Sequence, residues 1–121
     1  MAVRQLIPRT APEWGLYVTL VLAAGITEEY AYRGVGMWAL SLWTGNAWVA
    51  ALVLSVAFGL AHITQEWKSV GIVVAMALLM HALVTLTGTL VVAMVVHVVY
   101  DWIAAALLRR EMAAEPVSAP G

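Results

Sequence analysis

The sequence Glu-Glu-Tyr-Ala-Tyr-Arg at residues 28–33 places three charged side chains within an otherwise apolar run. A charged side chain at the centre of a membrane-spanning helix costs about 2.5 to 3.5 kcal/mol on insertion scales, so such a cluster indicates a functional site. Residues four apart share a helix face, and Glu29 and Arg33 can therefore neutralise each other. Glu28 points about 100° away around the helix and is left as the carboxylate without a local counter-charge.

The apolar segments contain few other ionisable side chains, and two pairs of residues that include them have the spacing of one helix turn. His97 and Asp101 are four residues apart, as are Phe58 and His62, so each pair shares one helix face. His81 belongs to neither pair. Because a histidine within a membrane often does no more than bond to a neighbouring helix, we expect a structural role for His81.

Counting residues from the turn signals predicts that the ionisable groups meet at one depth. Glu28 lies about 17 residues before Gly45, and His62 lies about 17 residues after it. In an antiparallel helical hairpin, equal distances from the turn give similar depths. The second turn signal is at residues 87–89. Counted from it, Asp101 reaches roughly the depth of His62, and His97 lies one helix turn deeper. The sequence therefore predicts a polar cluster displaced towards one side of the membrane.

A glutamate with two histidines can perform two kinds of hydrolytic chemistry. Glu28, His62 and His97 can bind zinc, because two imidazoles and a carboxylate with an open fourth position suit a water-activating site. Alternatively, Glu28 can itself deprotonate a water that His62 positions, without any metal. His97 and Asp101 would then stabilise the oxyanion of a tetrahedral intermediate. The sequence leaves both schemes open.

The composition is that of a membrane protein. The chain has 121 residues, of which 64% are hydrophobic and 11% are charged, and its mean hydropathy is +0.91. Soluble domains usually contain about 45 to 50% apolar and about 25% charged residues. The net charge of −1 argues against nucleic acid as a partner, because phosphates are bound by basic surfaces. The absence of cysteine excludes disulfides and thiolate metal sites.

The pattern of apolar segments predicts an all-α, polytopic helical bundle with about four transmembrane helices. A span needs about 20 apolar residues, and helices are the only spanning structure that four segments could form. The first segment is about 45 Å long as a helix, more than a bilayer core needs. We expect it to be kinked, strongly tilted, or broken into a span and a short interfacial helix. The predicted spans are residues 14–43, 47–63, 70–86 and 90–108.

The same layout divides the chain and orients it in the membrane. We predict a cytoplasmic lead-in at residues 1–12, a membrane core at residues 13–110 and a disordered tail at residues 111–121. Four antiparallel spans place both termini and the segment 64–69 on one side. The positive-inside rule makes that side cytoplasmic, and the compact chain suggests a bacterial inner membrane. The basic residues on that side are Arg4, Arg9, Lys68, Arg109 and Arg110.

Three motifs follow one another between about residues 25 and 105. They are Glu28-Glu29 with Arg33-Gly34, then Phe58-Gly59-Leu60-Ala61-His62, and then Thr87-Gly88-Thr89 leading to His97 and Asp101. In this order they resemble the motifs of the CPBP family of intramembrane proteases. These are the CAAX-prenyl-protease-like proteins, which include bacterial relatives of the eukaryotic Rce1 enzymes. The three motifs together are specific, whereas each alone is weak.

The resemblance implies a role for each matching residue. In the family, the first glutamate and the first histidine are assigned to activating water, which implies these roles for Glu28 and His62. The later histidine and the residue four positions on are assigned to the oxyanion or to completing the site, which implies His97 and Asp101. Glu29, Arg33 and Phe58 would support them. The family commonly has Phe where this chain has Tyr32, and frequently has Asn where it has Asp101. Whether the family uses a metal is disputed.

We therefore predict an intramembrane endopeptidase that hydrolyses a peptide bond in a peptide or protein substrate within or at the lipid bilayer. An alternative from another class is a non-catalytic membrane protein that binds a partner, for example in bacteriocin self-immunity, which the resemblance also allows. A small transporter is a weaker third hypothesis, because the polar groups converge on one level and do not line a path across the membrane.

Overall fold

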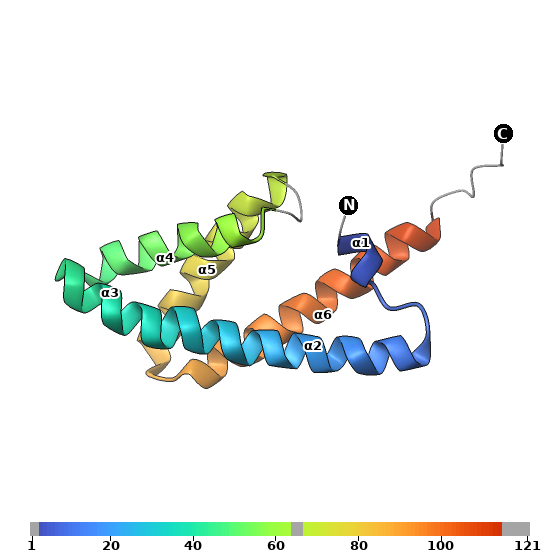
Figure 1. The fold of residues 1–121 in the computed structure, drawn as a ribbon, viewed down its shortest axis with the longest axis horizontal. Helices are drawn as coiled ribbons and strands as arrows, with labels where there is room; N and C mark the ends of the chain where they lie inside the picture. Colours follow the sequence, from blue (N-terminus) through green and yellow to red (C-terminus); the bar gives the residue numbers. More distant parts are fainter. Residues whose placement is uncertain (1–2, 64–66, 115–121) are drawn as a thin grey trace.

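The structure is a computed structural model that describes residues 3–63 and 67–114, and the regular structure in those two ranges is entirely helical. The predicted all-α fold is confirmed for this part of the chain. Figure 1 shows long helices that run back and forth, with short turns between them. The elements are α1 (Val3–Leu6), α2 (Ala11–Glu29), the π-helix η1 (Tyr30–Gly36), α3 (Met37–Thr44), α4 (Ala47–Ala61), α5 (Trp67–Thr87) and α6 (Leu90–Ala114).

The first long element is one continuous helical rod made of α2, η1 and α3 (Figure 1). Of the three alternatives expected for this segment, the break into a span and a separate interfacial helix is wrong, because the backbone at the junction stays helical. Gly36, which precedes α3, has φ −60° and ψ −48°. The chain instead widens into a π-helix over residues 30–36. Such segments often occur at functional sites, and this one begins directly after the two glutamates.

Both predicted turns end their helices at a left-handed glycine. Gly45 has φ 67° and Gly88 has φ 69°, a conformation that glycine adopts without a steric cost. Asn46 then starts α4, because its side-chain oxygen accepts hydrogen bonds from the backbone N–H groups of Trp48 and Val49 at 2.9 and 3.2 Å. The turn chemistry at residues 44–46 therefore fixes where α4 begins.

Two helices of the described ranges are long and apolar enough to cross a membrane, at Ser69–Thr87 and Leu90–Ala114. The helix α4 is also apolar, but with 15 residues it is shorter than a typical span of about 20 residues. Length and composition therefore support two of the about four predicted spans, and the others stay a prediction. Large apolar side chains face outwards, including Leu86 at 82% and Trp43 at 84% exposure, as expected for a surface in contact with lipid.

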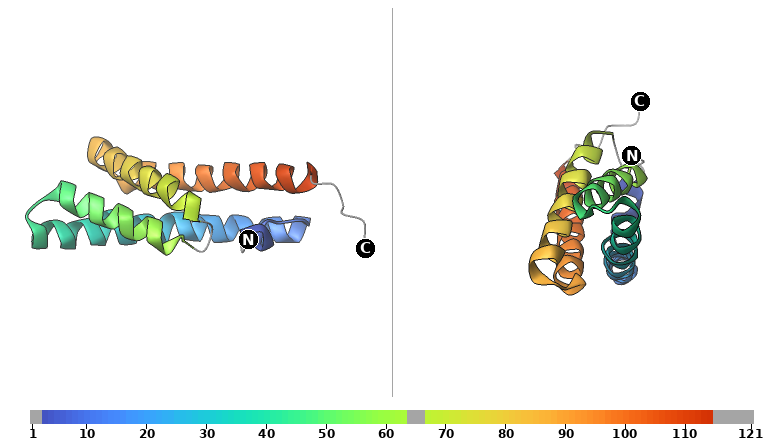
Figure 2. Two further views of the ribbon diagram at one scale, coloured as in Figure 1. Left: turned by 90° about the horizontal axis from the view of Figure 1, so that it is seen from above. Right: turned by 90° about the vertical axis from the view of Figure 1, so that its left-hand side faces the viewer.

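The helices pack as an antiparallel α4–α5 pair and an antiparallel α2–α6 pair, which Figure 2 shows from two further directions. Each pair has a glycine at its closest approach. A Cβ atom on Gly25 would lie 2.6 Å from Cγ2 of Val98, and one on Gly59 would lie 2.4 Å from Cγ2 of Val74. These two glycines let the helix backbones come together, which sets the spacing of the site residues on the same helices.

The ends of the chain differ from the prediction. The helix α6 continues to Ala114, so the expected disordered tail is wrong for residues 111–114. Their sequence, Glu-Met-Ala-Ala, consists of strong helix formers that extend the preceding helix. The rest of that predicted tail lies outside the described residues, as does the segment 64–66. Within the predicted lead-in, Ile7 and Pro8 are buried against the bundle.

Candidate active site

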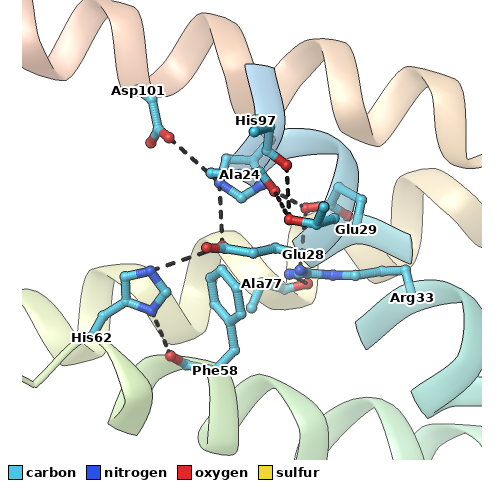
Figure 3. Close-up of polar contacts among 11 residues, drawn as sticks. Ala24, Glu28, Glu29, Arg33, Phe58, His62, Ala77, His97 and Asp101 are labelled. Carbon is cyan, nitrogen blue, oxygen red and sulfur yellow. Dashed lines mark hydrogen bonds and ion pairs between the residues drawn. The ribbon is translucent and has the colours of Figure 1, made fainter. Parts of the chain in front are cut away.

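The predicted site residues come from three segments that are far apart in the sequence and lie together in space (Figure 3). The segments are the junction of α2 with η1, the end of α4, and the middle of α6. The close approach is possible because both helix pairs are tightly packed. The residues brought together are Glu28, Glu29, Arg33, Phe58, His62, His97 and Asp101.

Glu28 extends between two imidazole rings (Figure 3). Its Oε2 atom lies 4.0 Å from Nε2 of His62 and 3.8 Å from Nε2 of His97. The side chain is half-buried, with 32% of its surface exposed. Among the described residues, Oε2 of Glu28 has no hydrogen-bond partner. A carboxylate oxygen in this position is available to accept a hydrogen bond from a water molecule.

The tautomer of His62 follows from its contact with the backbone. Nδ1 of His62 lies 2.8 Å from the carbonyl oxygen of Phe58. A carbonyl can only accept, so Nδ1 carries the hydrogen and donates it. In the neutral ring, Nε2 is then the unprotonated nitrogen, and it faces Glu28. The ring also packs on the phenyl ring of Phe58, with centroids 4.5 Å apart, which fixes its orientation.

His97 lies among three carboxylates. Its Nδ1 atom is 2.8 Å from Oε1 of Glu29, and its Nε2 atom lies 3.8 Å from Glu28 and 3.6 Å from Oδ2 of Asp101. The residue is buried. A carboxylate accepts a hydrogen from Nδ1, which directs Nε2 towards the other two acids. Glu29 therefore orients the imidazole of His97 relative to Glu28.

Glu29 and Arg33 form the buried ion pair that their spacing predicts. Nη1 of Arg33 lies 3.2 Å from Oε1 of Glu29, and the side chains are 1% and 0% exposed. Nη2 of Arg33 donates to the carbonyl oxygen of Ala77 on α5 at 3.3 Å, and the guanidinium lies 4.7 Å from the ring centre of Phe58. Arg33 therefore ties η1 to α4 and α5. A buried charge of this kind is tolerated only with such partners.

Two contacts of the site were not predicted from the sequence. The hydroxyl of Tyr17 donates to the backbone oxygen of Asp101 at 3.2 Å and so connects α2 to α6 beside the cluster. The carbonyl of Ala77 accepts from Arg33. A lone tyrosine hydroxyl within an apolar segment is a weak signal of such a contact, whereas a backbone carbonyl gives none. The expected structural histidine, His81, is buried on α5, and its role stays a prediction.

The cluster opens into a cavity of about 500 Å³. Glu28, His62, His97 and Asp101 lie on its wall. The remaining lining is mainly apolar and comes from residues 6–7, from α2, η1, α5 and α6, and from Phe58 of α4. Cavities of about 300 to 1,000 Å³ with a few convergent polar groups are typical of small-molecule or substrate sites. The structure therefore combines ionisable groups with space for a reactant.

The predicted zinc ligands have suitable atom types but are not in contact distance of one ion. Tetrahedral zinc with bonds of about 2.1 Å holds its ligand atoms about 3.4 Å apart. Glu28 lies 4.0 Å from His62 and 3.8 Å from His97. Among the described residues, no group of three or more histidine, cysteine, aspartate or glutamate side chains is arranged to hold a metal. The side chains as they lie do not form a zinc shell, and a zinc site stays a prediction.

The fold and the site define an all-helical protein with helices of membrane length and an internal cluster of acids and imidazoles. A family model described as type II CAAX prenyl endopeptidase Rce1-like matches residues 10–103. This range is most of the chain, so the protein belongs to the Rce1-like family, as the motifs predicted. No curated protein and no solved structure matched the chain. Members of the family are integral membrane proteases, which supports a peptidase in a membrane.

Proposed function

We propose that this protein is an intramembrane endopeptidase that hydrolyses a peptide bond with a water activated by Glu28 and His62. The observation that supports this most is the position of the Glu28 carboxylate. Its Oε2 atom lies within 4.0 Å of two imidazole nitrogens, on the wall of a cavity, without a hydrogen bond of its own among the described residues. A general base must be free to accept a proton from water.

The proposed reaction begins with a water molecule that donates one hydrogen bond to Glu28 and a second to Nε2 of His62. Glu28 accepts a proton while the water oxygen forms a bond to the carbonyl carbon of the substrate. The carbonyl oxygen becomes an oxyanion, and doubly protonated His97 donates to it from Nε2 while its Nδ1 stays bonded to Glu29. Glu28 then returns the proton to the departing amide nitrogen, and the carbon–nitrogen bond breaks.

The scheme with zinc remains the alternative for the same residues. Glu28, His62 and His97 would be the ligands, and a bound zinc ion would supply Lewis acidity and a more acidic water. Because the side chains do not lie at ligand distances from one common point, the steps above activate the water with Glu28 and His62 and without a metal. A chelator separates the two schemes, as discussed below.

The substrate that we propose is a peptide or protein segment in or at the membrane. We further propose that both termini are cytoplasmic and that the membrane is the inner membrane of a bacterium. His62 caps the end of α4, and that end of the helix points towards the same side of the bundle as α1 and the last turns of α6 (Figure 1). With this orientation, water and substrate would reach the site from the cytoplasmic side. The basic residues Arg4, Arg9, Arg109 and Arg110 support it.

The test is the Glu28→Gln change in protein reconstituted into liposomes, with cleavage of a fluorogenic reporter peptide as the readout. Glutamine keeps the shape of the side chain but cannot accept the proton, so we expect kcat to fall by about 10² to 10⁴-fold. Glu111→Gln is the matched control, because Glu111 is an exposed carboxylate near the end of α6. Cleavage by the Glu28→Gln variant at the unaltered rate would reject Glu28 as the base, whereas no cleavage by the unaltered protein would favour the non-catalytic, partner-binding alternative.

A further inference from the structure

An exposed arginine near the end of α6 is stacked on an aromatic ring of α2. The guanidinium carbon of Arg109 lies 5.5 Å from the ring centre of Trp14. A guanidinium that contacts the face of a ring still has N–H donors for a second partner, because those donors lie in its own plane. Among residues 3–63 and 67–114, no carboxylate forms an ion pair with Arg109. Arg109 is therefore available to an anionic ligand.

Two further aromatic side chains hold Trp14 in place. Trp102 of α6 packs edge-on against Trp14 with ring centroids 6.4 Å apart, and Tyr17 does so with centroids 5.9 Å apart. Tyr17 is also tied to α6 by its hydrogen bond to the backbone oxygen of Asp101. Trp14 is therefore fixed between α2 and α6, and it orients the guanidinium that lies on it before any ligand binds. We name Trp14, Trp102 and Arg109 the aromatic platform.

The packing of α2 against α6 places the aromatic platform at the expected level of the lipid headgroups. Trp14 lies 11 residues before Gly25, and Arg109 lies 11 residues after Val98, so the close contact of Gly25 with Val98 brings the two side chains opposite each other. From Leu90, where α6 begins, to Arg109 the helix rises about 30 Å, which is the thickness of a bilayer core. The start of α2 and the end of α6 lie at one end of the molecule (Figure 1). Tryptophan is enriched where that core meets the headgroups.

The same end of the bundle carries more basic than acidic side chains. Arg9 and Arg110 are exposed and add two positive charges to that of Arg109. The acids at this end are Glu13 and Glu111, and the carboxylate of Glu13 accepts hydrogen bonds from backbone N–H groups at the start of α2. The surplus of positive charge favours an anionic headgroup over a zwitterionic one, because the latter would bring a cationic amine towards the arginines.

We propose that the aromatic platform binds the phosphodiester group of an anionic phospholipid. The guanidinium of Arg109 donates two hydrogen bonds to the phosphate oxygens, in the bidentate geometry that arginine forms with phosphate. The indoles of Trp14 and Trp102 contact the glycerol region and the first methylene groups of the acyl chains, because an indole has apolar faces and a polar N–H group. A free phosphate ion offers the same oxygens without these apolar contacts. None of the three residues lines the cavity, so the lipid site is separate from the proposed reaction centre.

The first test titrates the purified full chain, in dodecyl maltoside micelles, with dioleoylphosphatidylglycerol and follows the midpoint of thermal unfolding. A ligand that binds the folded protein raises that midpoint, and we expect a rise of about 3 to 8 °C at saturation. Dioleoylphosphatidylcholine and inorganic phosphate, at the same concentrations, should change the midpoint by less than about 1 °C. No rise with phosphatidylglycerol, or an equal rise with phosphatidylcholine, would reject a site for an anionic headgroup. An equal rise with inorganic phosphate would overturn the assignment to a lipid.

The second test changes the aromatic platform and repeats the titration. Arg109→Lys keeps the charge but loses the planar fork that lies on Trp14, and Arg109→Gln loses both. We expect each change to raise the phosphatidylglycerol concentration at the half-maximal shift by about tenfold or more. Arg110→Gln is the matched control, because it removes the same charge from the adjacent exposed residue of α6. It should raise that concentration by less than about twofold.

Two results would reject the aromatic platform as a specific site. Equal losses in Arg109→Gln and Arg110→Gln would show a general attraction between lipid and a basic surface. Undiminished binding by Arg109→Lys would show that the stacked guanidinium is not required. The midpoint of each variant without added lipid reports whether it still folds, which we expect because both arginines are exposed. Neither result depends on peptide cleavage, so the lipid site and the peptidase proposal can fail separately.

Discussion

Glu28 and Glu29 are neighbours in the sequence, but the helix places their carboxylates in different surroundings. Glu29 is fully buried, with one oxygen shared between Arg33 and His97. Glu28 keeps 32% of its side-chain surface exposed in the cavity and has no such anchor. A carboxylate that is fixed by charged partners, such as that of Glu29, suits the positioning of a neighbouring histidine. A carboxylate oxygen without a hydrogen bond, such as Oε2 of Glu28, suits the acceptance of a proton from water. The division of roles between the two acids is therefore a consequence of the 100° step between adjacent helical residues.

Replacing Glu29 tests its positioning role. Glu29→Gln keeps an oxygen that can accept from Nδ1 of His97 but removes the charge that both His97 and Arg33 contact. We expect kcat to fall about 10 to 100-fold, as is usual for residues that orient a ligand or catalytic histidine. KM should change little, because Glu29 is fully buried behind His97. Steady-state kinetics on the reporter peptide measure both. A rise in KM with unchanged kcat would contradict the positioning role.

At the scale of helices, the long rod of α2, η1 and α3 carries Glu28 and Glu29. The close contact between α2 and α6 brings the imidazole of His97 next to these two acids. Arg33 belongs to the π-helix, and its guanidinium reaches Glu29, Ala77 and the ring of Phe58. Elements α2, α4, α5 and η1 are thus connected through one side chain. Activity should consequently depend on helix spacing as well as on the reacting groups.

Two glycines of α2 test this dependence in opposite directions. A Cβ at Gly25 would lie 2.6 Å from Cγ2 of Val98, whereas a Cβ at Gly15 meets nothing within 4 Å. Gly25→Ala should overpack the α2–α6 contact, destabilise the fold by about 1 to 3 kcal/mol and lower activity. Gly15→Ala should stabilise by up to about 1 kcal/mol and leave activity unchanged. Chemical unfolding in detergent micelles measures both, and shifts of the same sign would contradict the packing argument.

The start of α2 gives a prediction for pH. Glu13 lies just before the predicted first span, and the backbone N–H groups of Arg9 and Thr10 donate to its carboxylate at 2.6 and 3.3 Å. These hydrogen bonds hold the pKa of Glu13 below its ordinary value. A lowered folded-state pKa means that the stabilisation is present above the usual carboxyl pKa and is lost as pH falls through the lowered one.

The pH dependence is measured by thermal unfolding of the unaltered protein and of the Glu13→Gln variant. The unaltered protein should have the higher midpoint at pH 7, and the difference should shrink at an acidic pH, once the pH has fallen below the lowered pKa of the Glu13 carboxyl group. Glu111→Gln is the control, since Glu111 is exposed on α6. An equal difference between the two proteins at both pH values would show that this carboxylate does not contribute through its charge.

For the whole molecule, counting along the chain predicted the centre of the site well. The four-residue spacings and the equal distances from the turns place Glu28, His62 and Asp101 at one level. In the structure, Glu28 lies within 4.0 Å of both imidazoles, and Asp101 lies 3.6 Å from that of His97. These arguments work because helical rise and turn positions depend on local sequence. They did not predict the π-helix, the Ala77 contact or the burial of Ile7, which depend on packing between segments distant in the sequence.

Water can be activated by Glu28 and His62 without a metal or by a bound zinc ion. Which scheme applies depends on the packing of the whole molecule, because the three candidate zinc ligands come from α2, the end of α4 and α6. The separations of 3.8 and 4.0 Å around Glu28 exceed those of a zinc shell. We therefore expect protein treated with a strong zinc chelator, and then freed of it, to cleave the reporter at the unaltered rate. Metal content measured on the same sample by mass spectrometry provides the control. Loss of activity together with stoichiometric zinc, and its return when zinc is added back, would instead assign Glu28, His62 and His97 as ligands.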